Sequence, residues 1–216
     1  MPYKSLIQTV SPVLARLTFT LLNVIKMRNI IVSMNVTADG FMAGPDGELN
    51  WHFEFWDDEM CDCLCEQLYF ADTILLGKNT YNALARYWAN RAIEFSMPRG
   101  DIYFAQMMNN CQKVVCSKTI NPLIWINSTL IKGPLKNDIN ILKQKEGKNI
   151  ITYGSGTLVS SLFIEGVVDR LELWVHPVKI KSGVPFFKPG VPAGMVLSST
   201  KLLRSGVKII CYDKCY

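Results

Sequence analysis

The sequence predicts a single α/β domain with a mixed, mostly parallel sheet flanked by helices and an antiparallel hairpin at its C-terminal end. Short runs of β-branched and apolar residues alternate along the chain with amphipathic segments of helical spacing. This alternation is typical of a parallel sheet covered on both faces. Several runs stop at glycine or serine just before a helix. Two final runs are separated by a turn at Ser205-Gly206, which indicates a hairpin.

The first third of the chain contains two predicted strands and one predicted helix. Arg28–Val36 is apolar and β-rich, so it is the first strand, and Thr37–His52 is a loop because it contains a Gly-Pro-Asp-Gly turn. Three acidic residues favour a helix start at Asp57, and this helix is expected to reach about Ala71. Asp72 is expected to break the chain before a short buried strand at Thr73–Leu76.

The middle third continues the alternation. A helix opens at Gly77 and places Tyr81, Leu84 and Tyr87 at helical spacing, and a loop is predicted between Arg91 and Arg99. The next predicted elements along the chain are a strand at Lys113–Cys116, a strand near Leu130 and a helix at Leu135–Lys145.

The last third contains the clearest strand–turn–helix–strand pattern. An apolar run at Ile150–Tyr153 stops at a glycine turn, and a helix with Leu158 and Leu162 on one face ends at Gly166. A strand follows from Leu171. A long connection is predicted after His176-Pro177, followed by the two hairpin strands at Met195–Leu203 and Val207–Asp213.

Three strand ends have residues suited to phosphate: Gly77-Lys78-Asn79-Thr80, Ser117-Lys118 and Gly154-Ser155-Gly156-Thr157. In an open α/β sheet the carboxyl ends of the strands line one crevice, where ligands bind. Glycines allow close approach, and free N–H groups at helix starts attract phosphate. One such turn alone is often only a tight connection, but three together suit a pyrophosphate and a further phosphate, as in NADP. The absence of G-x-G-x-x-G excludes a standard Rossmann site.

Composition limits the class of protein. With 216 residues, of which 49% are hydrophobic, the chain suits one globular domain, placed at residues 27–216. The net charge of +5 comes from scattered basic residues, which excludes a nucleic-acid footprint. Seven cysteines at irregular spacing argue against a disulfide framework, so a cytoplasmic location is expected.

Residues 1–26 form an N-terminal extension of uncertain role. They contain three basic and no acidic residues, and the apolar stretch Leu17–Ile25 is too short to span a bilayer. A targeting leader, a natural start at Met27 and a helix docked in a dimer are the alternatives. No membrane partner is expected.

Four pieces of sequence resemble one superfamily when taken in order: SMNVTADGFMAGPDGELNW (Ser33–Trp51), ILLGKNTY (Ile74–Tyr81), KVVCSKT (Lys113–Thr119) and ITYGSGTLVSSLFIEGVVDRLELWVHPVKIKSGVPFF (Ile151–Phe187). The chain is similar to dihydrofolate reductase-like proteins, especially the reductase (C-terminal) domain of bifunctional riboflavin biosynthesis deaminase/reductases. The resemblance implies a single-domain dihydrofolate reductase-like fold, NADPH as cofactor and a homodimer.

The resemblance also implies which residues bind NADPH. Backbone near Val36 and Thr37 would contact the nicotinamide. The remaining positions are Gly77 at a close turn; Asn79, Thr80, Gly154, Ser155, Gly156 and Thr157 at the pyrophosphate; Lys78, Ser117 and Lys118 at the 2′-phosphate; and Tyr153 as a further cofactor-binding residue. Lys78 stands where the family usually has arginine, and Ser155 stands where it often has a second glycine.

Hydride transfer to a polarised C=N or C=O needs orientation and a proton from the protein. The candidate catalytic carboxylates are Asp57, Asp58 and Asp39, the first two because dihydrofolate reductases place an acid after a tryptophan resembling Trp51. A helix cap is the alternative role for Asp57 and Asp58. Trp51 and Phe55 are expected to contact a planar substrate, or else to belong to the core or a dimer interface.

Two other features, an H-x-E motif and His176, do not indicate a metal site or a catalytic residue. His52-Phe53-Glu54 matches the H-x-E of zinc deaminases, but the cysteines that follow lack the P-C-x-x-C spacing, so no metal is expected. His176 ends a strand and is interpreted as structural. The sequence thus predicts an NADPH-dependent reductase of a small heterocyclic (pteridine- or pyrimidine-like) or carbonyl substrate. The alternatives are a non-catalytic dinucleotide-binding or ligand-sensing protein, and a structural homodimer with a vestigial site.

Overall fold

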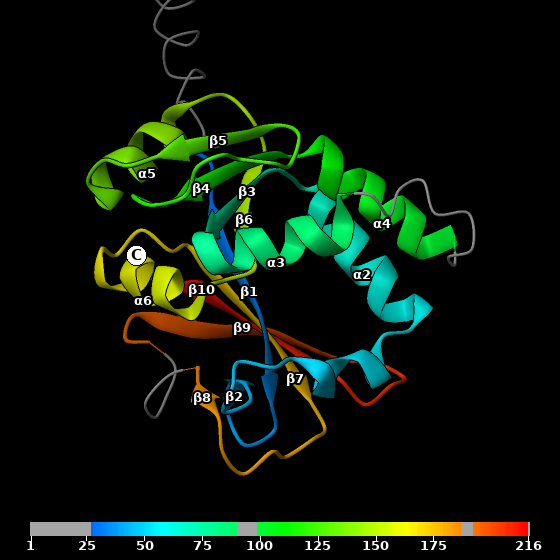
Figure 1. Ribbon diagram of the computed structural model, residues 1–216. Helices are drawn as coiled ribbons and strands as arrows, with labels where there is room; N and C mark the ends of the chain where they lie inside the picture. Colours follow the sequence, from blue (N-terminus) through cyan, green and yellow to red (C-terminus); the bar gives the residue numbers. More distant parts are fainter. Residues whose placement is uncertain (1–26, 90–98, 187–191, 216) are drawn as a thin grey trace, which may run out of the picture.

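An eight-stranded sheet forms the centre of the computed structural model, which describes residues 27–89, 99–186 and 192–215 (Figure 1). Its strands lie in the order β5 (Ser128–Ile131), β4 (Gln112–Cys116), β3 (Ala71–Gly77), β6 (Asn149–Thr152), β1 (Ile30–Thr37), β7 (Arg170–His176), β10 (Lys208–Lys214) and β9 (Met195–Leu202). The six strands from β5 to β7 are parallel, and β10 and β9 are antiparallel to their neighbours. The predicted fold class is therefore confirmed.

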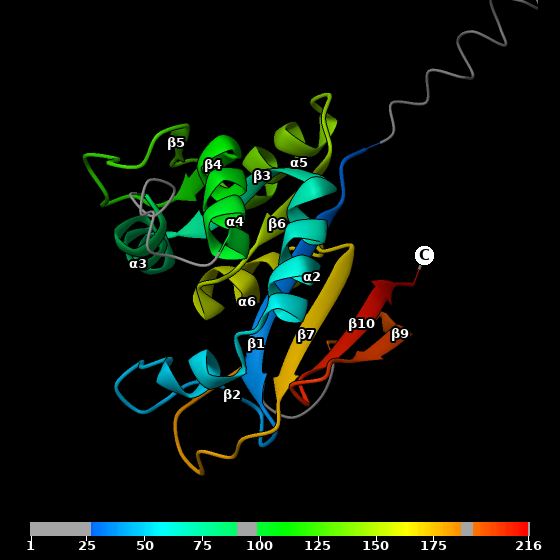
Figure 2. The ribbon, with the colours of Figure 1, turned by 90° about the vertical axis from the view of Figure 1, so that its right-hand side faces the viewer.

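Helices cover both faces of the sheet. They are α2 (Asp58–Tyr69), α3 (Lys78–Trp88), α4 (Arg99–Asn110), α5 (Leu135–Gln144) and α6 (Gly156–Ile164), with a short 3-10 helix, η1 (Asn50–Phe55), before α2. Seen from the side, α2 crosses in front of β1 and β7 (Figure 2). Among these residues no helix is both long and apolar enough to cross a lipid bilayer.

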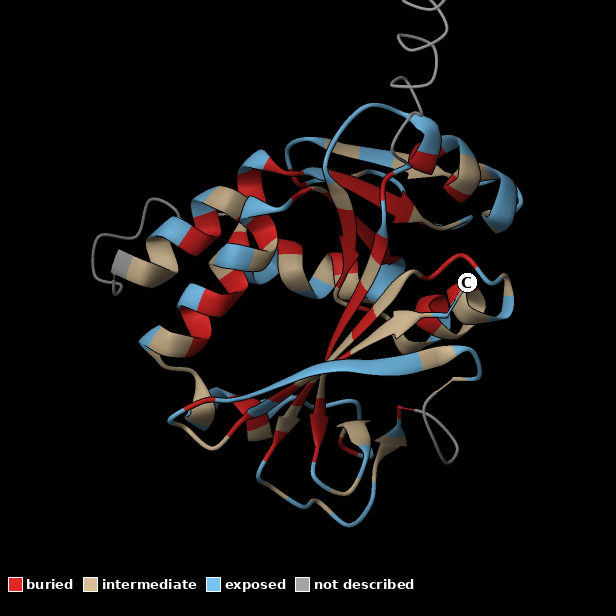
Figure 3. Ribbon diagram, turned by 180° about the vertical axis from the view of Figure 1, so that it is seen from behind, coloured by how far each residue is buried: buried red, intermediate tan, exposed pale blue. Residues whose placement is uncertain are grey.

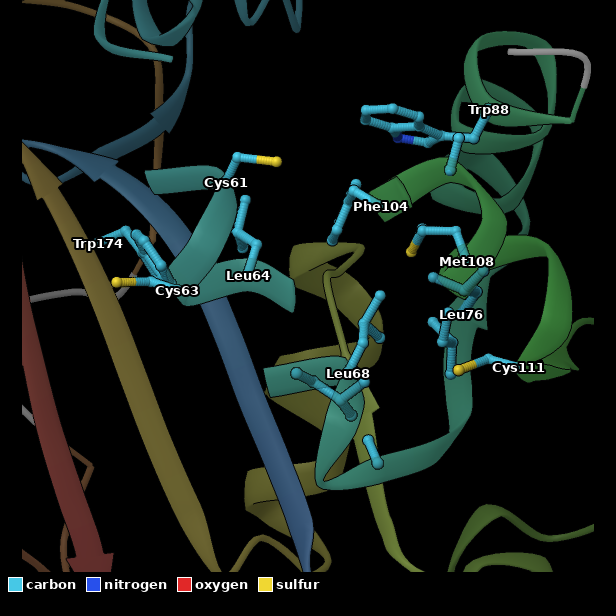
Figure 4. Close-up of a cluster of buried hydrophobic side chains, with 14 of the residues drawn as sticks. Cys61, Cys63, Leu64, Leu68, Leu76, Trp88, Phe104, Met108, Cys111 and Trp174 are labelled. Atoms are coloured by element: carbon cyan, nitrogen blue, oxygen red, sulfur yellow. The ribbon is translucent and has the colours of Figure 1, made fainter. Parts of the chain in front are cut away.

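The core has two parts, one on each face of the sheet. In the first, α2, α3 and α4 pack on β3 and β7. Figure 4 shows Leu64 and Leu68 of α2 in the same cluster as Leu76 of β3 and Met108 of α4. In the second, α5 and α6 pack on alternate residues of β1, beginning with Ile30. Burial of apolar side chains on both faces explains why the central strands read as continuous apolar runs. Figure 3 shows these strands as the buried centre of the molecule.

Several elements differ from the prediction. The α4 helix was not anticipated, because its sequence, RGDIYFAQMMNN, mixes glycine and asparagines with apolar residues. Its inner side chains, Phe104, Ala105 and Met108, are fully buried next to α2. The predicted loop Thr37–His52 contains strand β2 (Phe41–Ala43), which pairs with β8 (Val184–Pro185) in the connection after β7. Strands of three and two residues have no readable periodicity.

Asp72 does not interrupt the chain but lies inside β3, and its carboxylate forms an ion pair with the buried Arg28. The same guanidinium donates to Thr73 Oγ1 at 2.7 Å and to the carbonyl of Lys148 at 2.6 Å. An acidic residue is therefore tolerated as the second residue of β3, because the guanidinium of Arg28, just before β1, neutralises it.

Parts of the prediction lie outside the described residues. These are the N-terminal extension at residues 1–26, the predicted loop at 91–98 and the part of the long connection at 187–191. The predicted division into residues 1–26 and 27–216 stays a prediction.

Candidate active site

The three predicted strand ends meet at one groove. They belong to β4, β3 and β6, which are neighbours in the sheet, so parallel pairing places their carboxyl ends side by side. A groove of about 430 Å³ opens there. The predicted residues that line it are Gly77, Lys78, Asn79, Ser117, Lys118, Ser155 and Thr157.

Two helices begin at this groove without side-chain caps. The N-cap residues are Gly77 for α3 and Ser155 for α6, and neither side chain bonds to the first turn. Neither first turn contains an acidic residue. The amide N–H groups at both helix starts, with the positive ends of the helix dipoles, therefore suit a negatively charged group.

Ser155 fits its position because Gly77 has no side chain. A Cβ atom at Gly77 would lie 2.7 Å from Ser155 Oγ, too close for an unstrained contact. The amide of Gly77 also donates to the carbonyl of Gly154 at 3.4 Å, which holds the two strand ends together. Gly154 has φ +114°, and a Cβ there would come within 3.3 Å of Thr80 Oγ1. The serine therefore replaces a family glycine without blocking the groove.

Positive charge predominates among the charged residues that line the groove. Lys78, Lys118 and Lys132 line it, with Asp138 as the carboxylate among the lining residues. Lys78 Nζ donates to Thr119 Oγ1 at 3.1 Å, which links the start of α3 to the turn after β4. These ammonium groups suit a phosphate monoester.

Ser117 has a local role within this turn. Its hydroxyl accepts from the amides of Thr119 and Ile120, both at 3.2 Å. Beside it, burial raises the pKa of the Cys116 thiol to about 12, so this thiol adds no negative charge to the groove.

The β5–α5 connection is a part of the groove that the sequence analysis missed. Lys132 and Gly133 of this connection line it together with Asp138 of α5, and the sequence predicted no role for any of them. A signal existed, since Lys132-Gly133-Pro134 follows a predicted strand as a fourth strand end with glycine and lysine.

The carboxylate of Asp39 braces the loop after β1. Thr37 Oγ1 donates to Asp39 Oδ1 at 2.6 Å, and the amide of Lys181 donates to Asp39 Oδ2 at 2.9 Å. The hydrogen bond from Thr37 is the main cause that lowers the pKa of Asp39. These bonds stabilise the ionised form, which suits a tether between two loops better than a proton donor.

Asp57 and Asp58 begin helix α2. Asp57 accepts from the amide of Met60 at 2.8 Å, so the alternative role as a helix cap is confirmed for this residue. Asp58 is exposed in the first turn, and neither carboxylate lines the groove.

Trp51 and Phe55 of η1 contact the same buried side chain, His176 at the end of β7. The ring centroids lie 5.2 Å apart for Trp51 and His176, and 5.4 Å apart for Phe55 and His176. His176 Nε2 is 2.9 Å from Asn35 Oδ1. The structure thus brings the two predicted aromatic residues together around a histidine and an asparagine for which no binding role was predicted.

Val36 and Thr37 lie at the end of β1 next to this cluster. Both are buried, and Thr37 is directly opposite His176 in the parallel pairing of β1 with β7. Tyr153, Thr80 and Gly156 lie beside the groove residues in sequence but are not among those that line it. Among the described residues, no group of histidine, cysteine and carboxylate side chains could hold a metal ion.

Comparison with known proteins identifies a family. The model of the RibD C-terminal domain matches residues 28–209. The uncharacterized protein YyaP of Bacillus subtilis (strain 168) is 30% identical over 197 residues, which cover 88% of this chain and 97% of YyaP.

Solved structures with the same fold include a putative riboflavin biosynthesis protein from Shewanella sp. PV-4, with a TM-score of 0.65 and 18% identity over 87% of this chain and 99% of the other. A diaminohydroxyphosphoribosylaminopyrimidine deaminase/5-amino-6-(5-phosphoribosylamino)uracil reductase from Thermotoga maritima has a TM-score of 0.63. It is 13% identical, and the match covers 92% of this chain and 59% of the other. Dihydrofolate reductase from Enterococcus faecalis, complexed with NADP(H), has a TM-score of 0.56. It is 12% identical, and the match covers 86% of this chain and 96% of the other. These similarities confirm the dihydrofolate reductase-like fold.

Proposed function

The chain belongs to the RibD C-terminal domain family, and we propose that it is a reductase that transfers a hydride from NADPH to a small heterocyclic or carbonyl substrate. The observation that carries this proposal is the groove at the ends of β3, β4 and β6, where two uncapped helix starts and three lysines lie together. The names of two proteins with the same fold support it, since both are reductases and one is complexed with NADP(H).

The residues of the groove fit this cofactor. The first-turn amides of α3 and α6, with Asn79 and Thr157 of the groove and Thr80 beside it, would bind the pyrophosphate. Lys78 and Lys118 would bind the 2′-phosphate. When bound, the reduced nicotinamide supplies the hydride.

The chain's own residues would orient the substrate next to Val36 and Thr37. Trp51 and Phe55 form an aromatic wall there around His176. This wall excludes water from the reacting atoms, which strengthens each polar contact made inside it.

A second candidate function is a dinucleotide-binding or ligand-sensing protein without catalysis. The observation that favours it is the use of Asp39 and Asp57 in local hydrogen bonds, which leaves neither as a free proton donor. Oxidation of NADPH that depends on an added substrate would separate the reductase from this alternative.

The test is a thermal-shift titration with NADPH, NADH and NADP⁺. We expect NADPH to stabilise the protein by about 2.7 kcal/mol at a concentration of one hundred times its Kd. Lys78→Ala should weaken NADPH binding roughly tenfold, because a charge-assisted hydrogen bond is lost, and should change NADH binding little.

Lys145→Ala is the matched control, because Lys145 is an exposed lysine at the end of α5, before the amino end of β6. It should leave both affinities unchanged. A folded protein that no nucleotide stabilises would contradict the reductase and the dinucleotide-binding protein alike.

The proposed enzyme acts as a cytoplasmic homodimer without nucleic-acid partners. Seven cysteines without disulfide bonds support a reducing compartment.

A further inference from the structure

Asp138 brings a negative charge into a groove that otherwise suits an anion. It lies on α5 and lines the groove together with the lysines Lys78, Lys118 and Lys132. A carboxylate repels the phosphate groups of a nucleotide, so it does not help to bind them. Because a carboxylate can only accept hydrogen bonds, it suits a part of a ligand that carries an N–H or O–H group.

Asp138 is half-buried, and its carboxylate is unpaired in the described part of the chain. Apart from the backbone bonds of α5 and its cap, no hydrogen bond or ion pair reaches Asp138 among these residues. Two lysines of the same helix have other acids as partners: Lys136 pairs with Glu165 at 3.9 Å, and Lys143 pairs with Asp169 at 2.6 Å. Both oxygens of Asp138 can therefore accept hydrogen bonds from a ligand.

The position of this carboxylate is defined by its neighbours. A Cβ atom at Gly133 would lie 2.8 Å from each of the two oxygens of Asp138, so the carboxylate rests on the bare Cα of Gly133. Burial is the main cause that raises the pKa of the Cys116 thiol to about 12, and the negative charge of Asp138 raises it further. The carboxylate therefore enters the groove beside the ends of β4 and β5.

The strand order places the phosphate-binding features at the other side of the groove. The sheet runs β5, β4, β3 and β6, and the two uncapped helices, α3 and α6, begin after β3 and β6. The groove thus changes from a side that suits phosphate, at β6 and β3, to a side with an acceptor, at β4 and β5.

The side of the groove near Asp138 has apolar walls. Ile131 is paired with Cys116 at the ends of β5 and β4, and Leu135 lies one turn before Asp138 on α5. Leu158 of α6 also lines the groove. A nucleobase has flat apolar faces and a polar edge, so these side chains suit its faces and Asp138 suits its edge. A groove of about 430 Å³ is within the usual range for small ligands.

We propose that Asp138 accepts a hydrogen bond from the 6-amino group of the adenine of NADPH and makes the groove specific for adenine. This assignment rests on the proposed binding of NADPH. The ribose 3′-hydroxyl is another donor of the same nucleotide, but it is next to the 2′-phosphate, which repels a carboxylate. A purine with a carbonyl oxygen at position 6 would oppose an acceptor with an acceptor, which is unfavourable.

A structural role for Asp138 makes a different prediction. It lies in the first turn of α5, where the helix dipole stabilises a negative charge. In that role Asp138 would contribute to the stability of the helix and would not distinguish one base from another.

The experiment compares NADPH with its hypoxanthine analogue, in which a carbonyl oxygen replaces the 6-amino group, by isothermal titration calorimetry. We expect the native protein to bind NADPH about tenfold or more tightly than the analogue. Asp138→Asn should bind the two nucleotides within about twofold of each other, because an amide can donate as well as accept. The ratio of the two affinities is the readout, since the change in net charge affects both nucleotides alike.

A second variant moves the carboxylate without removing its charge. Gly133→Ala places a methyl group where the carboxylate of Asp138 lies, so the carboxylate has to turn away. The preference for NADPH should fall in this variant as well. Glu146→Gln is the matched control, because Glu146 is an exposed acid beyond the other end of α5, and it should preserve the preference.

Three results would overturn the assignment. If the native protein binds both nucleotides equally well, Asp138 does not read the base, although the proposed binding of NADPH stands. If Asp138→Asn weakens both nucleotides equally, the carboxylate binds the ribose instead. If Asp138→Asn lowers the free energy of unfolding but keeps the preference, its role is structural. A folded protein that binds neither nucleotide would contradict the proposed function itself, and this assignment with it.

Discussion

At the scale of single residues, His176 shows how burial changes chemistry. The unfolded chain has a histidine pKa of about 6.5, whereas burial lowers the pKa of folded His176 to about 4. At a pH between these two pKa values, the imidazole is protonated in the unfolded state and neutral in the folded state. The free energy of unfolding therefore falls as the pH drops through this window and is fully retained above it.

Between about pH 7 and about pH 4, we expect protonation of His176 in the unfolded state to lower the free energy of unfolding by up to about 3 kcal/mol. His176→Gln has no such titration, so its stability should depend less steeply on pH. Urea denaturation of both proteins across this range measures the difference. Parallel pH profiles for the two proteins would show that His176 is not held neutral by the fold.

The carboxylates illustrate the opposite case, in which local hydrogen bonds determine a residue's role. Asp57 and Asp39 were both candidate catalytic acids, but each carboxylate already has local partners. Asp57 accepts a hydrogen bond from the amide of Met60. Asp39 accepts hydrogen bonds from the hydroxyl of Thr37 and the amide of Lys181. Sequence indicates that an acid is present, whereas only the folded backbone shows which N–H groups surround it.

At the scale of elements, the β2–β8 pair connects two segments that are far apart in sequence. Phe41 and Ala43 pair with Pro185 and Val184, while Asp39 binds the backbone at Lys181. These contacts hold the loop after β1 against the connection after β7. Both segments flank the ends of the strands that position Thr37 and His176, so this small sheet supports the proposed substrate site.

Gly183 is the position on which this pair depends. It has φ +154°, and a Cβ atom would lie 2.2 Å from the carbonyl oxygen of Ala43. Gly183→Ala should lower the free energy of unfolding by about 2 kcal/mol through this clash, because the neighbour is backbone and cannot move aside easily.

The control is Gly194→Ala, since Gly194 also has a positive φ, +82°, but no atom within 4 Å of the added Cβ. Gly194→Ala should lower the free energy of unfolding by about 1 kcal/mol, because it adds backbone strain but no clash. If chemical denaturation shows that both variants lower the free energy of unfolding by the same amount, the proposed close packing of β2 against β8 is wrong.

At the scale of the whole molecule, the sheet ends at two edge strands, β5 and β9, of which β9 is the more exposed. Strand β9 is exposed along nearly its whole length and appears as a pale blue band in Figure 3. Val196, Leu197 and Leu202 are 51%, 62% and 65% exposed. An apolar edge strand of this length invites pairing with another chain, which supports the proposed homodimer.

We expect the protein to be a dimer by light scattering, and the double variant Leu197→Glu with Leu202→Glu to be a monomer, because charges on an edge strand oppose its pairing. Ile164→Glu is the control: Ile164 is 83% exposed at the end of α6 and should leave the dimer intact. A monomeric native protein would rule out this part of the proposal.

The sequence by itself determined the alternation of strands and helices, and with it the parallel sheet and the C-terminal hairpin. It also identified three strand ends with glycines and lysines, since these signals are local and depend on residue type and spacing. Elements whose stability comes from distant partners escaped it: α4, which packs on α2, and the short strands β2 and β8.

Only the tertiary structure decided which of the candidate residues meet. Parallel pairing made β4, β3 and β6 neighbours and so joined their ends in one groove with the β5–α5 connection. It also placed His176 opposite Thr37, more than one hundred positions earlier in the chain, and η1 placed Trp51 and Phe55 against it. The physical reason is that strand register and burial depend on contacts between distant segments, which residue types alone do not specify.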